Sequence, residues 1–207
     1  MEEMRNIGRP LEFDPVSALD AAIDVFWREG YKGANMTGLL EAMNLSKSSL
    51  YQSFGNKSDL FQLCLTKYAD DLASSMQSQL MDSKSGWEFI VEFLYGVADT
   101  AQRPEGVKGC FLVNSVNEFG QTEEKFLDVF KTGIDAVNSI FFAAVERAKK
   151  EGEIKKSVDL KDVVIYLQIV ISGMRTMIKG GLDKKTTKTL VSLMLENFAQ
   201  FRVQKIA

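Results

Sequence analysis

Hydrophobic residues recur along most of the chain three or four positions apart, which is the spacing of one face of an α-helix. No segment shows the two-residue alternation of a β-strand between hairpin turns. Prolines stand only at positions 10, 15 and 104, so none interrupts the later helical pattern. The pattern predicts an all-α fold. The predicted helices are 15–30, 36–43, 47–53, 57–80, 86–102, 109–119, 122–150, 159–179 and 184–203.

Two of these helices, 36–43 and 47–53, are too short to be stable alone, because an isolated helix in water needs about 12–15 residues. Asn35 and Ser46 are residues that favour the N-cap position, and Asn44 tolerates the left-handed conformation that ends a helix. Each helix has one apolar face to bury. The segment therefore predicts a helix-turn-helix unit held together by its neighbours.

The outward face of helix 47–53 is polar. In a helix-turn-helix unit the second helix lies in the major groove with its N-terminal residues at the base edges. Lys47 can pair with guanine, Gln52 with adenine, and Ser48 with several bases. Lys57 opens the next helix, where free N–H groups and a lysine suit a phosphate. The alternative is a small helical subdomain whose polar face is only solvated.

Charge does not decide between these interpretations. The net charge is −3, and the first 60 residues contain six Lys/Arg against nine Asp/Glu, whereas DNA-binding domains are usually basic. Between residues 30 and 57, however, there are three lysines and one glutamate. The local field at the contact surface matters more than the sum.

The chain contains no histidine, which removes Ser-His-Asp and Cys-His catalysis and most zinc chemistry. There is no Gly-rich phosphate loop or acidic metal cluster. We therefore expect no metal, no cofactor and no enzymatic activity. A thiol peroxidase or reductase using Cys110 is the enzymatic alternative, and it lacks a histidine base. Two cysteines, no membrane-length apolar run and no secretory signal predict a cytoplasmic protein.

Three stretches, "GRP" at 8–10, "ALDAAIDVFWREGYKGANM" at 18–36 and "LLEAMNLSKSSLYQSFGNKSDLF" at 39–61, resemble the DNA-binding domain of the TetR family of bacterial transcriptional repressors. Asn44 stands where glycine is commoner in the family. Beyond residue 61 only the length and the number of helices agree. The residues that match the family pattern are Phe26, Gly30, Tyr31, Leu50, Tyr51, Phe54 and Lys57.

The resemblance implies a role for each candidate DNA contact. Tyr51 and Lys57 would bind phosphates, and Thr37 would lie near the backbone or an edge base. The residues that would face bases are Lys47, Ser48, Ser49 and Gln52. Arg5 and Arg9 would form an arm that reaches DNA, with a solvated tail as the alternative.

The resemblance also implies two domains, a helix-turn-helix DNA-binding domain over 1–57 and an effector-binding and dimerisation domain over 58–207. Helices 159–179 and 184–203 are apolar on more than one face, so we expect two copies to pair them in a four-helix bundle. The alternative is a monomer that buries both faces itself. A homodimer would place two recognition helices on a palindromic operator in double-stranded DNA.

The middle of the chain is where TetR-like proteins hold a small-molecule effector. Tyr95, Asn114 and Gln168 are candidate effector contacts, although such residues also serve as plain core. Cys110 follows Lys108 at a predicted helix N-terminus, and both features make a thiol more reactive. Some TetR-like regulators resemble this segment and respond to oxidants or electrophiles; the alternative is a small buried hydrophobe, as we expect for Cys64.

The sequence thus predicts a ligand-responsive, DNA-binding transcriptional regulator. We expect a repressor that leaves its operator when a small molecule binds or a thiol is modified. The alternative function is that of a helical small-molecule-binding protein with no role on DNA.

Overall fold

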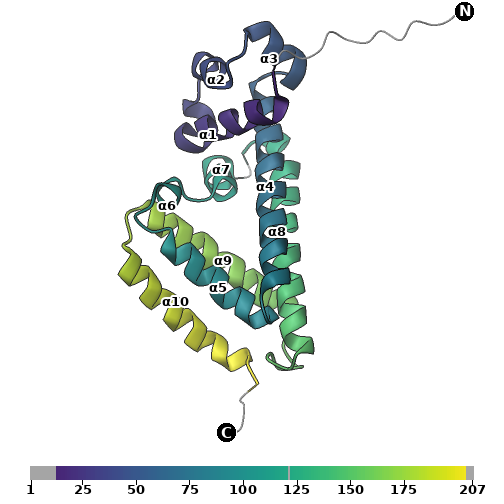
Figure 1. The fold of residues 1–207 in the computed structure, drawn as a ribbon, viewed down its shortest axis with the longest axis vertical. Helices are drawn as coiled ribbons and strands as arrows, with labels where there is room; N and C mark the ends of the chain where they lie inside the picture. The colour runs from purple at the N-terminus through teal and green to yellow at the C-terminus, as the bar shows by residue number, and fades with distance from the viewer. Residues whose placement is uncertain (1–12, 121, 204–207) are drawn as a thin grey trace, which may run out of the picture. The chain divides into compact units, whose positions relative to one another are not determined.

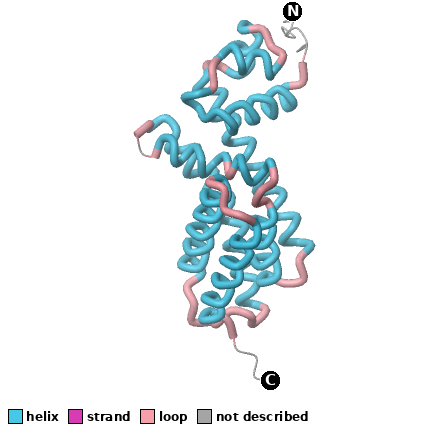
Figure 2. Tube along the Cα trace, turned by 90° about the vertical axis from the view of Figure 1, so that its left-hand side faces the viewer, coloured by secondary structure: helices cyan, strands magenta, loops and turns pink. Residues whose placement is uncertain are grey.

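The computed structural model describes residues 13–120 and 122–203, and its regular structure over these ranges is helical (Figures 1 and 2). The chain divides into two compact units, residues 1–64 and 65–207. The division falls inside helix α4, Lys57–Asp82, whereas the sequence analysis separates the domains just before this helix. One continuous helix therefore contributes to both units.

The first unit contains α1, Pro15–Gly33, α2, Met36–Met43, and α3, Lys47–Phe54, followed by the start of α4. The predicted caps are confirmed. Asn35 Oδ1 accepts a hydrogen bond of 3.0 Å from the Gly38 N–H, and Ser46 Oγ accepts one of 3.1 Å from the Ser49 N–H. Asn44 ends α2 in the left-handed conformation, with φ of 51°. These caps fix the short turn between α2 and α3.

Side chains from all four helices close the core of the first unit. Leu39 of α2 and Leu50 of α3 have no exposed surface, and Phe26 of α1 lies 5.0 Å from Phe61 of α4 between ring centroids. Full burial of a side chain of this size contributes about 1.5–3 kcal/mol. The neighbours of the two short helices thus supply the stability that their length does not.

The turn between α3 and α4 requires a glycine. Gly55 has φ of 75°, a left-handed value that other residues rarely adopt. Directly after it, Asn56 Oδ1 accepts from the Ser58 N–H at 2.8 Å, and Asp59 Oδ2 accepts from the Asn56 N–H at 2.9 Å. This reciprocal capping sets the first turn of α4 next to the end of α3.

The second unit packs the later part of α4 with six further α-helices and a short 3₁₀ helix. Its core combines side chains of α4, α5, α8, α9 and α10, and Figure 1 shows α5 and α9 side by side. The helices are α5 Gly86–Asp99, α6 Pro104–Lys108, α7 Phe111–Phe119, α8 Glu124–Lys150, α9 Leu160–Lys179, α10 Lys184–Phe198 and η1 Ala199–Phe201.

Several predicted boundaries were wrong. The helix predicted over 86–102 ends at Asp99, and Gln102 has a positive φ of 67°. A residue before proline disfavours helical geometry, so Arg103, which precedes Pro104, is extended. A short helix that was not predicted, α6, begins at Pro104. The helix predicted from 109 begins at Phe111, and the one predicted to 203 ends at Phe198. α1 continues to Gly33 across a kink at Gly30.

α9 carries an apolar stripe that the single chain leaves uncovered. Ile165, Ile169 and Met177 are 53 %, 66 % and 56 % exposed, at intervals of four or eight residues. They lie on one side of the helix, opposite buried residues such as Leu167 and Ile171. None of the helices within the described ranges is long and apolar enough to cross a membrane.

Candidate nucleic-acid interface and ligand cavity

Helix α3 buries one face and presents the other to solvent. Leu50 and Phe54 hold it against the core, whereas Lys47, Tyr51 and Gln52 are exposed. Tyr51 keeps 45 % of its surface exposed, which is large for an aromatic side chain. The buried residues Leu50 and Phe54 are four positions apart and so share one face of the helix, and the exposed residues lie on the other face. The predicted base-reading and phosphate-binding side chains of α3 are therefore on its free face.

Three serines organise the N-terminal end of α3. Ser46 Oγ lies 2.9 Å from Ser48 Oγ and 2.8 Å from Ser49 Oγ. Ser48 is exposed, and Ser49 is half-buried beneath it. Hydroxyls can both donate and accept, so this cluster can adapt to different base edges or phosphates. The short side chains also leave room for a close approach of the backbone.

The other two predicted contacts lie on neighbouring helices. Thr37 is exposed in the first turn of α2. Lys57, the first residue of α4, has its Nζ 4.5 Å from the centroid of the Tyr31 ring. Such a cation–π contact restrains a flexible lysine while leaving its charge available. Arg5 and Arg9 lie outside the described residues.

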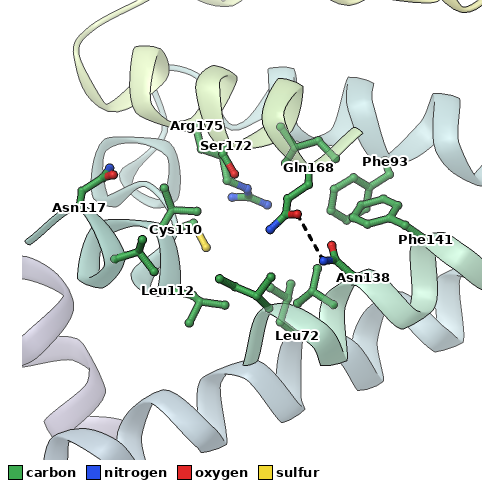
Figure 3. A pocket seen from close by; sticks show the side chains of 15 residues that line it. Leu72, Phe93, Cys110, Leu112, Asn117, Asn138, Phe141, Gln168, Ser172 and Arg175 are labelled. Atoms are coloured by element: carbon green, nitrogen blue, oxygen red, sulfur yellow. Dashed lines mark hydrogen bonds between the residues drawn. The ribbon is translucent and has the colours of Figure 1, made fainter. Parts of the chain in front are cut away.

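The second unit contains a cavity of about 210 Å³ lined by side chains of α4, α5, α7, α8 and α9 (Figure 3). Most of its wall is apolar, with side chains such as Leu72, Leu112 and Ile171. Phe93 and Phe141 form one wall, edge to face, with ring centroids 5.2 Å apart. A concave, mostly apolar space with a few polar groups is the usual form of a small-molecule site.

The polar groups of the cavity come mainly from one face of α9. Gln168, Ser172 and Arg175 all line it, at positions i, i+4 and i+7. From α8, Asn138 Nδ2 donates to Gln168 Oε1 at 3.3 Å. Asn138 Oδ1 is buried and accepts no hydrogen bond from the described residues. A buried carbonyl oxygen without a donor is uncommon and marks a place for a ligand or water.

Cys110 meets the cavity from the N-cap position of α7, as its predicted place at a helix start requires. The Tyr68 hydroxyl donates to Cys110 Sγ at 3.5 Å. Burial raises the pKa of Tyr68 well above its usual range, Cys110 adds to the rise and Arg175 opposes it. The tyrosine therefore stays protonated at neutral pH and remains a donor to the sulfur.

Two of the predicted effector contacts lie elsewhere. Tyr95 does not line this cavity; its hydroxyl is 3.2 Å from Ser192 Oγ, beside an open depression between α5 and α10. Asn114 Nδ2 donates at 2.7 Å to the Lys108 carbonyl and so holds the turn before α7. Of the four residues that the sequence suggested for the effector site, Cys110 and Gln168 therefore line the cavity, and Tyr95 and Asn114 do not.

Four polar cavity residues were not predicted from the sequence: Asn117, Asn138, Ser172 and Arg175. The signal for the last two was present on α9, where a glutamine, a serine and an arginine repeat at helical spacing within an otherwise apolar segment. Neither cysteine forms a disulfide, and Cys64 is fully buried in the first unit. In the described part of the chain, no three His, Cys, Asp or Glu residues gather as metal ligands would.

The chain matches two family models. Residues 18–64 match bacterial regulatory proteins of the tetR family, and residues 86–192 match the tetracyclin repressor-like C-terminal domain. The first range covers the helix-turn-helix unit, and the second includes most of the cavity residues.

Curated relatives and solved structures agree with these matches. The HTH-type transcriptional repressor ComR of Escherichia coli K12 is 26 % identical over 84 % of this chain and 83 % of its own length. The HTH-type transcriptional regulator YezE of Bacillus subtilis is 28 % identical over 78 % of this chain and 84 % of its own. A cysteine mutant of the regulator CifR, solved with a 26-base-pair operator DNA, superposes with a TM-score of 0.80 at 26 % identity, covering 91 % of this chain and 98 % of that one.

Proposed function

The chain belongs to the TetR family of bacterial regulatory proteins. We propose that it is a repressor and that ligand binding in the cavity of its second unit controls its affinity for a palindromic operator. The chain is a DNA-binding transcriptional regulator, as its family is. The proposal adds repression, the form of the operator and the site of control. The main support for the proposal is that α3 exposes a polar face while its apolar face is buried in the core of the helix-turn-helix unit.

On DNA, α3 would enter the major groove. Lys47, Ser48 and Gln52 would meet base edges, with Ser49 beneath them supporting the approach. Phosphates would be held by Tyr51 and by Lys57, whose ammonium group is restrained at the start of α4. The operator complex of CifR, a structural neighbour, supports this mode of binding.

A palindromic operator follows from two copies of the chain. The exposed stripe of Ile165, Ile169 and Met177 on α9, with exposed Leu193 on α10, is the surface that a second copy would cover. These residues belong to the two helices for which the sequence predicts a four-helix bundle. A two-fold dimer presents two α3 helices, so each would read one half of an inverted repeat.

Control would pass along α4. This helix begins at Lys57, a proposed phosphate contact, and its later residue Leu72 lines the cavity. Occupation of the cavity, or modification of the Cys110 thiol that borders it, would shift α4 and weaken operator binding. A coupling of about 1–3 kcal/mol changes affinity 5- to 150-fold, which is sufficient for a switch.

We propose that the protein carries out no catalysis and works in the bacterial cytoplasm, where its operator lies. The absence of histidine from the sequence removes the usual partner for a catalytic Cys110. The family match supports a regulator over both the thiol enzyme and the carrier without a role on DNA.

The direct test is selection of bound fragments from a library of genomic DNA by the purified protein. We expect enrichment of an inverted repeat whose half-site centres are about one helical turn apart or a multiple of that distance. Lys57→Gln should weaken binding to all sequences and reduce the salt slope by about one. Lys131→Gln, an exposed residue of α8 with the same charge change, should bind as wild type.

If no sequence is enriched at low and moderate salt, the proposed operator recognition is wrong. Equal losses for the Lys57 and Lys131 variants would instead show that only overall charge matters, and would remove Lys57 from the interface.

A further inference from the structure

Among the described residues that line the cavity, Arg175 is the only charged one. It is half-buried on α9, and among the described residues no carboxylate forms an ion pair with it and no acceptor receives its hydrogen bonds. The cavity wall is mostly apolar, and a charge beside such a wall is costly unless it is paired. The cavity therefore has a net positive charge that the protein itself does not balance.

We propose that the cavity binds a small aromatic monocarboxylate, with its carboxylate on Arg175 and a hydroxyl or N–H group at its other end on Asn138. This inference rests on the proposed function, since it names the ligand class of the same control site. A guanidinium presents parallel N–H donors that match the two oxygens of a carboxylate. Arginine is thus well suited to select an acid over a neutral compound.

The cavity also contains a hydrogen-bond acceptor without a donor. Asn138 Oδ1 is buried without a donor, because the amide of this residue uses its Nδ2 to bond Gln168. Gln168 stands seven residues before Arg175, about 10 Å along the helix axis. Figure 3 shows the Gln168 amide and the Arg175 guanidinium pointing into the same space, with Asn138 beyond the glutamine. In that view the two groups without partners, the Arg175 guanidinium and the Asn138 amide oxygen, lie on either side of the Gln168 amide.

The size and walls favour a single ring. The cavity volume is about 210 Å³, and an apolar protein cavity of about 150 Å³ holds benzene. One ring with short substituents at opposite positions therefore fits, whereas a fused multi-ring compound does not. The edge-to-face pair Phe93 and Phe141 offers an aromatic wall on which such a ring can pack.

The Cys110 sulfur is the competing partner for Arg175, since it borders the same space (Figure 3). Its hydrogen bond comes from Tyr68, and no contact of Arg175 with the sulfur is found in the described structure. We therefore assign the guanidinium to the ligand. The two assignments predict different behaviour when the thiol is removed.

The test is calorimetric titration of the full-length protein at neutral pH with benzoate, phenylacetate, 3-hydroxybenzoate and 4-hydroxybenzoate, each beside its neutral carboxamide. We expect at least one acid to bind ten or more times more tightly than its amide. Arg175→Gln should remove this preference and Arg175→Lys should retain part of it. Lys179→Gln, which removes a positive charge from the exposed end of the same helix, should behave as wild type.

The hydroxyl end has its own control. Asn138→Leu should remove any preference for a hydroxybenzoate over benzoate while leaving the preference for acid over amide. Melting temperatures of each variant confirm that it is folded before it is titrated.

Three results would overturn the proposal: no acid binding more tightly than its amide, an acid preference that survives in Arg175→Gln, or acids that bind only to Cys110→Ser. The last would assign Arg175 to the thiolate.

Operator binding is measured in parallel. If an acid binds without weakening DNA binding, the proposed ligand class stands, but the cavity does not control operator binding. Release of DNA by a neutral compound alone preserves control and refutes the carboxylate.

Discussion

The polar residues of α3 and those of the cavity are arranged in opposite ways. On α3 they stand exposed on a short helix whose buried side is already satisfied, so they are available to a large, charged partner. In the cavity, Gln168, Asn138 and Arg175 stand among mostly apolar side chains, and the Asn138 Oδ1 atom and the Arg175 guanidinium have no hydrogen-bond partner within the described chain. Exposed polar groups are hydrated when no partner is bound, so they cost little free energy. Buried polar groups without a partner carry an uncompensated desolvation cost until a ligand binds them. The first arrangement suits recognition and the second suits sensing.

The largest expected effect separates the two faces of α3. Leu50→Ala should lower the free energy of unfolding by about 2–5 kcal/mol, because it opens a cavity at a fully buried position. Gln52→Ala, two residues away on the exposed face, should leave it unchanged within about 0.5 kcal/mol. Denaturant unfolding of both variants measures the difference. Comparable losses for the two would show that the exposed face also has a structural role.

The same exposed residue should matter on DNA. Gln52→Ala should weaken binding to the selected operator by about 1–3 kcal/mol if the amide reads a base, and should relax the preference at that position. Fluorescence anisotropy with the operator and with single-base variants measures both. A loss that is the same for all sequences would place Gln52 at the phosphates instead.

In the cavity we expect a gain of stability at the cost of function. Arg175→Met should raise the stability of the protein without ligand by about 1 kcal/mol, or about 2–4 °C in melting temperature, because a half-buried charge without an ion-pair partner is replaced by an apolar chain of similar length. Thermal unfolding in buffer without organic acids measures the change. A clear decrease would mean that Arg175 already has a stabilising partner.

The smallest effect concerns a charge that is already paired. Asp99 Oδ1 lies 2.8 Å from Lys184 Nζ and 2.9 Å from Lys188 Nζ, and hydrogen bonds from these lysines lower the pKa of Asp99 to about 2. Because this pKa is below the ordinary value of about 3.9, the carboxylate stabilises the fold above about pH 4, and its contribution disappears as the pH falls through about 2.

Asp99→Asn should therefore lower the melting temperature by at most about 2–4 °C at pH 7, since exposed ion pairs contribute little. The difference from wild type should shrink between pH 4 and pH 2. Melting curves across this range measure it, and a difference that is constant with pH would exclude the ion pairs as its cause.

The contrast also explains what the sequence could predict. The caps, the turn and the exposed face of α3 depend on residues close together in the chain, so Asn35, Asn44 and Ser46 are recognisable in order. The end of α5 at Asp99 was missed, although the proline at 104 was a signal for a break.

The cavity depends on residues far apart in the chain. Asn138 and Arg175 come from different helices, and only packing makes them neighbours of Cys110. Tyr95 and Asn114 are the same residue types as many ligand contacts, but the fold uses them in an open depression and in a turn. Composition could suggest a pocket, but it could not select which polar residues would face it.

The central claim is that the cavity controls DNA binding, and one measurement tests it without knowledge of the natural ligand. Cys110 is buried but borders the cavity, so a small reagent that enters the cavity can reach its thiol, whereas Cys64 has no exposed surface and should react more slowly. Alkylation of Cys110 with iodoacetamide, with the site confirmed by mass spectrometry, places a small group in the cavity. We predict that the operator dissociation constant rises 5- to 150-fold in the folded, labelled protein, and that treated Cys110→Ser binds as before. Labelled protein that binds the operator as tightly as unlabelled protein would contradict the account.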